Sequence, residues 1–173
     1  MKTEFIDVRY RGEIKLNEKV IAKLKRCKVV AVYTSVQFIN NLPSVVKQLK
    51  DAKVNVVISK PARADCDGQI LGCDVYCENL NLPSDVDAVL FIGDGEFHPL
   101  ALLYSGIKQV ISYNPLNNKL RVFSKGDIDK VLNKKQANVK KFLMSDVIGI
   151  IISTKWGQEH FNYVGKLKEK YKD

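Results

Sequence analysis

The chain has 173 residues, of which 46% are hydrophobic and 27% are charged, and this balance excludes a wholly disordered protein. Its longest apolar runs, 86–92 and 147–152, are far shorter than the ~20 residues that a transmembrane helix needs, so we expect no membrane association. The net charge of +9 comes from lysines spread along predicted helices without an aromatic recognition motif, which argues against direct nucleic-acid binding.

The first half of the chain alternates between predicted strands and helices. In chain order, apolar spacing predicts a strand at 4–8, a helix at 16–24, a strand at 29–33, a helix from a Thr34-Ser35 cap to about 52, a strand at 54–58 and a short helix at 73–80. Strands that are apolar at nearly every position are typical of a sheet buried on both faces.

The alternation continues in the second half. In chain order, the sequence predicts a strand at 86–92, a helix at 99–104, strands at 109–112 and 120–123 (the latter edge-like), a helix from Ser124 or Asp127 to 142, a strand at 147–152 and a helix at 161–171. This order predicts an α/β fold with an open, mostly parallel sheet and helices on both faces, a Rossmann-like arrangement of three layers. We expect one domain at 1–145, followed at 146–173 by the first strand and helix of a truncated second domain.

Cys73 is the first candidate for chemistry. Acidic residues near the N-terminus argue against a signal peptide, so we expect a cytoplasmic protein whose four cysteines are thiols, ligands or core residues rather than disulfides. Cys73 follows a glycine and is predicted to begin a helix, where the helix dipole favours the reactive thiolate. The alternative is a small buried residue at a helix start. Because no Cys-x-x-Cys pair is present, the spacing argues against a metal site made by this chain alone.

The segment from Gly93 to Pro99 is the second candidate. His98 precedes Pro99, which predicts an extended backbone just before a helix; its ring would serve in polar contact or proton transfer, or would only fix the turn. The glycines of Gly93-Asp94-Gly95 would let backbone amides face a ligand. The chain has neither a phosphate-binding loop nor a Gly-x-Ser-x-Gly elbow, which argues against a nucleotide hydrolase and an α/β hydrolase.

Three motifs in a fixed order carry a family resemblance. They are Gly68-Gln69-Ile70-Leu71-Gly72-Cys73, Phe91-Ile92-Gly93-Asp94-Gly95-Glu96-Phe97-His98-Pro99-Leu100-Ala101 and Ile152-Ser153-Thr154-Lys155-Trp156-Gly157-Gln158. In sequence and order they resemble the diphthamide synthesis protein family. The segments 34–37 and 112–123 also fit the middle domain of that family, so the resemblance covers nearly the whole chain.

This resemblance implies an enzyme that uses a 4Fe-4S cluster and S-adenosylmethionine to transfer a 3-amino-3-carboxypropyl group to a histidine of translation elongation factor 2. Members of the family act as dimers, and each has three similar α/β domains that each supply one cysteine to the cluster. Cys73 matches the cysteine of the middle domain and is therefore the implied metal ligand. The resemblance also implies cofactor contacts from Gly93, Gly95, His98, Ser153, Thr154, Gly157 and Gln158.

The chain matches only the middle domain and the start of the third, so the resemblance implies that the other two cluster ligands come from elsewhere. Three interpretations follow: a fragment of a longer enzyme, a reduced member that needs partner subunits in a homo- or hetero-dimer, or a paralogue that has lost the reaction. The rival function is a non-catalytic scaffold that binds a protein partner of the same pathway. A basic nucleic-acid binder ranks third.

Overall fold

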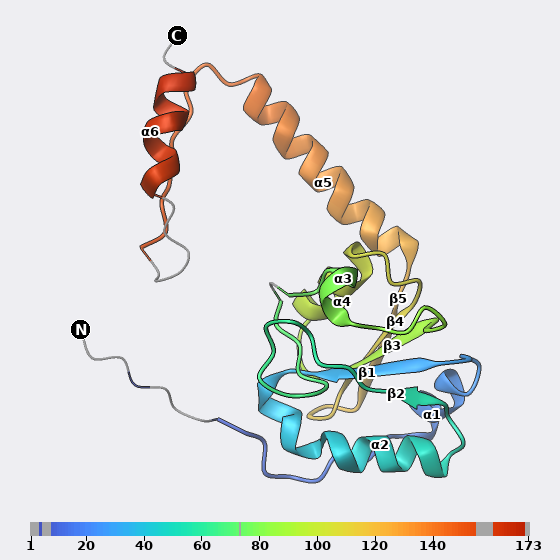
Figure 1. Ribbon diagram of the computed structural model, residues 1–173. Coiled ribbons are helices and arrows are strands. Elements are labelled where there is room, and N and C mark those ends of the chain that lie inside the picture. Colours follow the sequence, from blue (N-terminus) through green and yellow to red (C-terminus); the bar gives the residue numbers. More distant parts are fainter. Residues whose placement is uncertain (1–3, 5–7, 73, 155–160, 172–173) are drawn as a thin grey trace. The chain divides into compact units, whose positions relative to one another are not determined.

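The computed structural model of the chain describes residue 4 and residues 8–72, 74–154 and 161–171 (Figure 1). They form two compact units, 1–131 and 132–173, and each unit is described by itself. The predicted division into a domain at 1–145 and the start of another at 146–173 stays a prediction. Most of the strand predicted at 4–8 lies outside the described residues.

The first unit is built on a five-stranded sheet. Its strands are β1 (Val30–Thr34), β2 (Val56–Val57), β3 (Ala88–Ile92), β4 (Val110–Asn114) and β5 (Lys119–Phe123). Their order across the sheet is β2-β1-β3-β4-β5; the first four strands are parallel, and β5 is antiparallel to β4. The predicted open, mostly parallel sheet is confirmed, and so is the edge position of β5.

Helices cover both faces of this sheet, as predicted, because alternate side chains of each buried strand point to opposite faces. Val30 and Val32 of β1 belong to one core with α1 (Glu18–Leu24), the 3-10 helix η1 (Val36–Asn41) and α2 (Leu42–Asp51). Ala31 and Tyr33 belong to the other core with α3 (Cys77–Leu80), α4 (Phe97–Tyr104) and Ile128 of α5 (Lys125–Leu143). The result is three layers, visible for most elements in Figure 1.

Two predicted helices have different bounds in the structure. The helix predicted from 34 to 52 is divided into η1 and α2, and Pro43 lies in the first turn of α2, where its missing N–H is harmless. The helix predicted at 99–104 begins two residues earlier, at Phe97. Pro99 is tolerated inside the first turn for the same reason, so the prediction that His98 is extended and precedes the helix is wrong.

The second unit corrects one further prediction. No strand forms at 147–152; Val147 and Ile151 are 89% and 98% exposed. A strand needs a neighbour for its backbone N–H and C=O groups, and residues 132–154 and 161–171 do not supply one. The terminal helix is confirmed as α6 (Phe161–Lys170), and the rings of Phe142 and Tyr171 meet edge to face at 6.3 Å.

Within the described ranges, no helix combines the length and the apolar character that crossing a membrane would require.

Candidate functional site

The candidate site lies at the carboxyl edge of the parallel strands. There β1, β3 and β4 end at Thr34, Ile92 and Asn114. In open α/β sheets this edge is where ligands bind, because the loops that follow the strands gather there.

The loop that leads to Cys73 is anchored at this edge. The backbone N–H of Thr34 donates to the carbonyl of Gly68 at 2.8 Å, and the N–H of Ile70 donates to the carbonyl of Thr34 at 2.9 Å. The Thr34 hydroxyl in turn donates to the carbonyl of Ile92 at 2.8 Å. Residues 68–70 therefore lie beside the end of β1 like a short extra parallel strand.

Glycines allow this loop to pass close to its neighbours. Gly68 has a φ of +72°, in the left-handed region, and a Cβ there would collide with Leu42 of α2. A Cβ on Gly72 would occupy the space of the Phe97 ring at the start of α4. The Gly72–Phe97 contact brings two of the three sequence motifs together in space.

Cys73 itself lies outside the described residues. The short helix predicted to begin at Cys73 begins at Cys77 instead, with Tyr76 as its N-cap. The sequence argument that a helix dipole activates the Cys73 thiol therefore does not hold. The described residues next to it in the chain are Gly72 and Asp74.

Asp74 was missed in the sequence and is completely buried. One carboxylate oxygen accepts a hydrogen bond from the backbone N–H of Arg63 at 2.6 Å, and the other accepts one from the Asn79 amide at 2.7 Å. These bonds connect the loop before Cys73 with helix α3 after it. A buried carboxylate needs such partners, but in a sequence it resembles any exposed loop aspartate.

His98 lies in the first turn of α4. Its ring stacks on buried Phe91 at a centroid distance of 5.2 Å and meets Phe97 edge to face at 5.3 Å. Burial lowers the pKa of His98 below its usual 6.5, because an apolar environment disfavours the imidazolium ion. At neutral pH His98 is therefore a neutral imidazole that can both donate and accept a hydrogen bond.

This burial predicts a pH dependence of folding. The unfolded chain, with an ordinary His98 pKa near 6.5, binds more protons than the folded chain between the two pKa values, so stability falls as the pH drops through that window. We expect urea unfolding to give a higher free energy at pH 7.5 than at pH 5.5 and NMR titration of His98 to give a midpoint below 6.5. His98→Gln is the control and should flatten this pH dependence; an unchanged slope would contradict the assignment.

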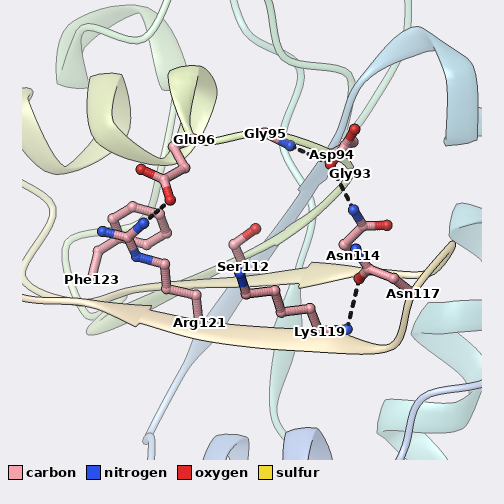
Figure 2. Close-up of a pocket in the computed structure, with 10 residues that line it drawn as sticks. All are labelled: Gly93, Asp94, Gly95, Glu96, Ser112, Asn114, Asn117, Lys119, Arg121 and Phe123. Carbon is pink, nitrogen blue, oxygen red and sulfur yellow. Dashed lines mark hydrogen bonds and ion pairs between the residues drawn. The ribbon is translucent and has the colours of Figure 1, made fainter.

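A pocket of about 170 Å³ opens beyond the ends of β3 and β4 (Figure 2). It is lined by Gly93, Asp94, Gly95, Glu96, Ser112, Asn114, Asn117, Lys119, Arg121 and Phe123. The predicted residues Gly93 and Gly95 thus line the pocket, whereas His98 is not among its lining residues. The polar residues of β4 and β5 were missed, although Ser112 and Asn114 interrupt an otherwise apolar strand at alternate positions.

The walls of the pocket are held by polar contacts. Arg121 pairs with Glu96 and, at 2.9 Å, with Asp127, while its guanidinium lies 4.4 Å from the centre of the Phe123 ring. On the other side, Asp94 accepts hydrogen bonds from the Asn114 amide at 2.6 Å and from the backbone N–H of Gly95 at 2.8 Å.

The described residues do not form a metal centre by themselves. No three His, Cys, Asp or Glu side chains gather within the ranges that the structure describes. Cys27 lies at the opposite edge of the sheet, before β1, where its thiol contacts Gln109 and burial raises its pKa. Cys66 is exposed and contacts Gln69 through its thiol at 3.4 Å. A three-thiolate cluster site is therefore not contained in the described part of this chain.

The remaining predicted site residues belong to the second unit. Ser153 and Thr154 are exposed between α5 and α6. Gly157 and Gln158 lie outside the described residues. Their implied cofactor contacts stay a prediction.

Comparisons with known proteins place these motifs in context. Residues 1–173 match the family described as a diphthamide synthesis protein. The chain is 27% identical over 168 residues to the 2-(3-amino-3-carboxypropyl)histidine synthase of Methanocaldococcus jannaschii, covering 91% of this chain and 42% of the relative. It is 32% identical over 146 residues to the synthase of the same name from Pyrococcus horikoshii, covering 84% and 40%.

The fold is also similar to a solved structure, Dph2 from Pyrococcus horikoshii, which has been determined also with a 4Fe-4S cluster. The TM-score is 0.73 at 25% identity, and the match covers 90% of this chain and 44% of that one. The chain thus spans less than half the length of these relatives.

Proposed function

Because the chain belongs to the diphthamide synthesis protein family, we propose that it forms part of a 2-(3-amino-3-carboxypropyl)histidine synthase. In this proposal the complete enzyme transfers the 3-amino-3-carboxypropyl group of S-adenosylmethionine to a histidine of translation elongation factor 2. The names of the archaeal relatives support the reaction type, and the cluster-containing Dph2 structure supports the participation of a 4Fe-4S cluster.

In this enzyme Cys73 is a ligand of the cluster. The observation that carries the proposal is the anchoring of residues 68–70 to Thr34 at the carboxyl edge of the sheet. Together with the Gly72–Phe97 contact and buried Asp74, it fixes the backbone on both sides of Cys73. A thiolate bound to metal needs a fixed backbone of this kind, because the distance between metal and sulfur is set within a few tenths of an ångström.

The chain supplies only this motif cysteine, so the proposal requires two more thiolates from outside the described residues, in a longer chain or in a homo- or hetero-dimer. The chain's own residues would shape the cofactor's surroundings. Gly93 and Gly95 line the pocket at the strand ends, and neutral His98 lies on the adjoining helix. Ser153, Thr154, Gly157 and Gln158 would complete the contacts from the following segment.

A second function is kept because no cluster of three ligands is found among the described residues. In this alternative the chain is a non-catalytic scaffold whose carboxyl edge binds elongation factor 2 or a companion subunit. The two functions differ in what Cys73 does: the enzyme needs its thiolate, and the scaffold does not.

The test is Cys73→Ala in the complete assembly that contains this chain, purified anaerobically and reconstituted with iron and sulfide. We expect iron content to fall and transfer of labelled 3-amino-3-carboxypropyl groups to elongation factor 2 to be lost, while the assembly stays intact on gel filtration. Cys66→Ala is the matched control, because Cys66 is exposed in the same loop. It should keep both iron and activity.

Undiminished activity of the Cys73→Ala assembly would overturn the ligand assignment and favour the scaffold. Loss of assembly in both variants would instead show that the loop is structural.

A further inference from the structure

The floor of the pocket in Figure 2 is built by the pairing of β4 with β5. The antiparallel register places Val110 opposite Phe123, Ser112 opposite Arg121 and Asn114 opposite Lys119. Because these positions alternate along both strands, all six side chains lie on one face of the sheet. The first pair belongs to the apolar core of that face, and the next two pairs continue beyond it as a polar surface.

Ser112 is the most informative of these residues. It is only 7% exposed, and Figure 2 shows its hydroxyl pointing into the pocket. Its hydroxyl has no hydrogen-bond partner among the residues that the structure describes. A hydroxyl on a mostly buried residue that opens into a pocket is available there to donate to or accept from a ligand.

The charged side chains around Ser112 differ in whether they are paired with an opposite charge. The Arg121 guanidinium is already paired with Glu96 and Asp127. Among the residues that the structure describes, Asp94 accepts only from neutral donors, the Asn114 amide and the Gly95 backbone, and no cationic side chain pairs with it.

Lys119 provides the opposite charge. This exposed residue lines the same pocket, and its ammonium group forms no ion pair within the described part of the chain. One free negative charge, one free positive charge and a hydroxyl therefore line a small pocket.

We propose that this pocket binds the ammonium and carboxylate groups of an α-amino acid. Asp94 would accept from the ammonium group, and Lys119 and Ser112 would donate to the carboxylate. A volume of about 170 Å³ suits a ligand of this size, since a cavity of roughly 150 Å³ holds a molecule with six heavy atoms. A simple anion would satisfy Lys119 but would face Asp94, and a simple cation would face Lys119.

The ligand can be a free amino acid or the amino-acid end of a larger molecule. S-adenosylmethionine is chosen as the larger molecule because of the proposed function. The inference that the pocket binds an ammonium and a carboxylate group rests on the charges alone. The two sources present the same two charged groups to the pocket.

The test titrates the full chain with three small compounds, followed through the NMR signals of the Gly93 and Gly95 amides. L-Methionine carries both charged groups, 4-(methylthio)butanoate lacks the ammonium group, and 3-(methylthio)propylamine lacks the carboxylate. We expect L-methionine to bind at least about tenfold more tightly than either analogue, because each lost contact is a hydrogen bond to a charged group.

Variants assign the two contacts. Lys119→Met should weaken L-methionine binding by about tenfold or more and leave binding of the amine analogue unaffected. Asp94→Asn should weaken L-methionine binding by a similar factor and leave binding of the carboxylate analogue unaffected. Ser112→Ala should weaken L-methionine and the carboxylate analogue. Lys108→Met is the matched control, because this exposed lysine lies just before β4 at the other edge of the sheet.

S-adenosylmethionine is the fourth probe. If it alone binds with this dependence on Lys119 and Asp94, the natural ligand is the larger molecule; if L-methionine alone does, it is the free amino acid. The inference is overturned if neither compound shifts the Gly93 and Gly95 amides, or if the analogues bind as tightly as L-methionine. That outcome leaves the proposed function intact, since Cys73→Ala tests it separately through iron content and transfer.

Discussion

Phe91→Ala is expected to lower the free energy of unfolding by about 3–5 kcal/mol. Phe91 lies in the central strand β3, is fully buried and belongs to the core of the face that carries α3 and α4. Its ring also stacks on His98 and lies directly beneath Gly93. Truncation removes buried apolar surface and leaves a cavity that a sheet paired on both sides cannot close by moving.

Urea unfolding followed by circular dichroism measures this loss. Leu116→Ala is the control, because this leucine is 53% exposed and its truncation should change stability by less than about 0.5 kcal/mol. If Phe91→Ala does not fold, Phe91→Leu should fold with a smaller loss. A loss below about 1 kcal/mol for Phe91→Ala would contradict the packing described for this face.

Asp74→Ala should cost about 3 kcal/mol of stability and loosen the segment around Cys73. The alanine leaves the Arg63 N–H and the Asn79 amide without the charged acceptor that both now contact. Each hydrogen bond to a charged group contributes roughly 1.5–3 kcal/mol, and the two bonds are not fully additive. Asp74→Asn should cost less, because its amide can accept from Arg63 and donate to Asn79 once the Asn79 amide turns over.

Hydrogen exchange measures the local part of this effect. In Asp74→Ala, amides in the segment 61–80 should exchange faster, while those of β1, β3 and β4 change only with global stability. Asp65→Ala, at an exposed position in the same loop, is the matched control and should leave exchange unchanged. Equal exchange in the unmodified chain, Asp74→Ala and Asp65→Ala would show that Asp74 does not hold this loop.

Much of the fold could be predicted because the sheet is buried on both faces. The strands β1, β3 and β4 are apolar at nearly every position, and this pattern distinguishes them from the amphipathic helices between them. The edge strand β5 alternates and was predicted as an edge. The start of α4 at Phe97 was less accurate because a proline in the first turn is compatible with more than one starting residue, and the start of α3 at Cys77 has no side-chain cap to mark it.

The strand predicted at 147–152 shows where such patterns fail. Its residues are as apolar as those of β3, and periodicity alone treats them alike. Val89 and Leu90 lie in a strand that pairs on both sides within a sheet whose faces helices cover, whereas Val147 and Ile151 have no such neighbours among the described residues of their unit. Hydrophobic sequence expresses a tendency to form a strand, and pairing decides whether it is realised.

The sequence by itself determined the family, the alternation of strands and helices, and the motif residues Cys73, Gly93 and His98. These features depend on local order, which a sequence states directly. Only the tertiary structure decided that residues 68–70 attach to Thr34, that Asp74 is buried, and that Ser112 and Lys119 share a pocket with Asp94. These contacts join residues distant in the chain, and a polar side chain acquires its role from the charge and burial of neighbours that only folding brings to it.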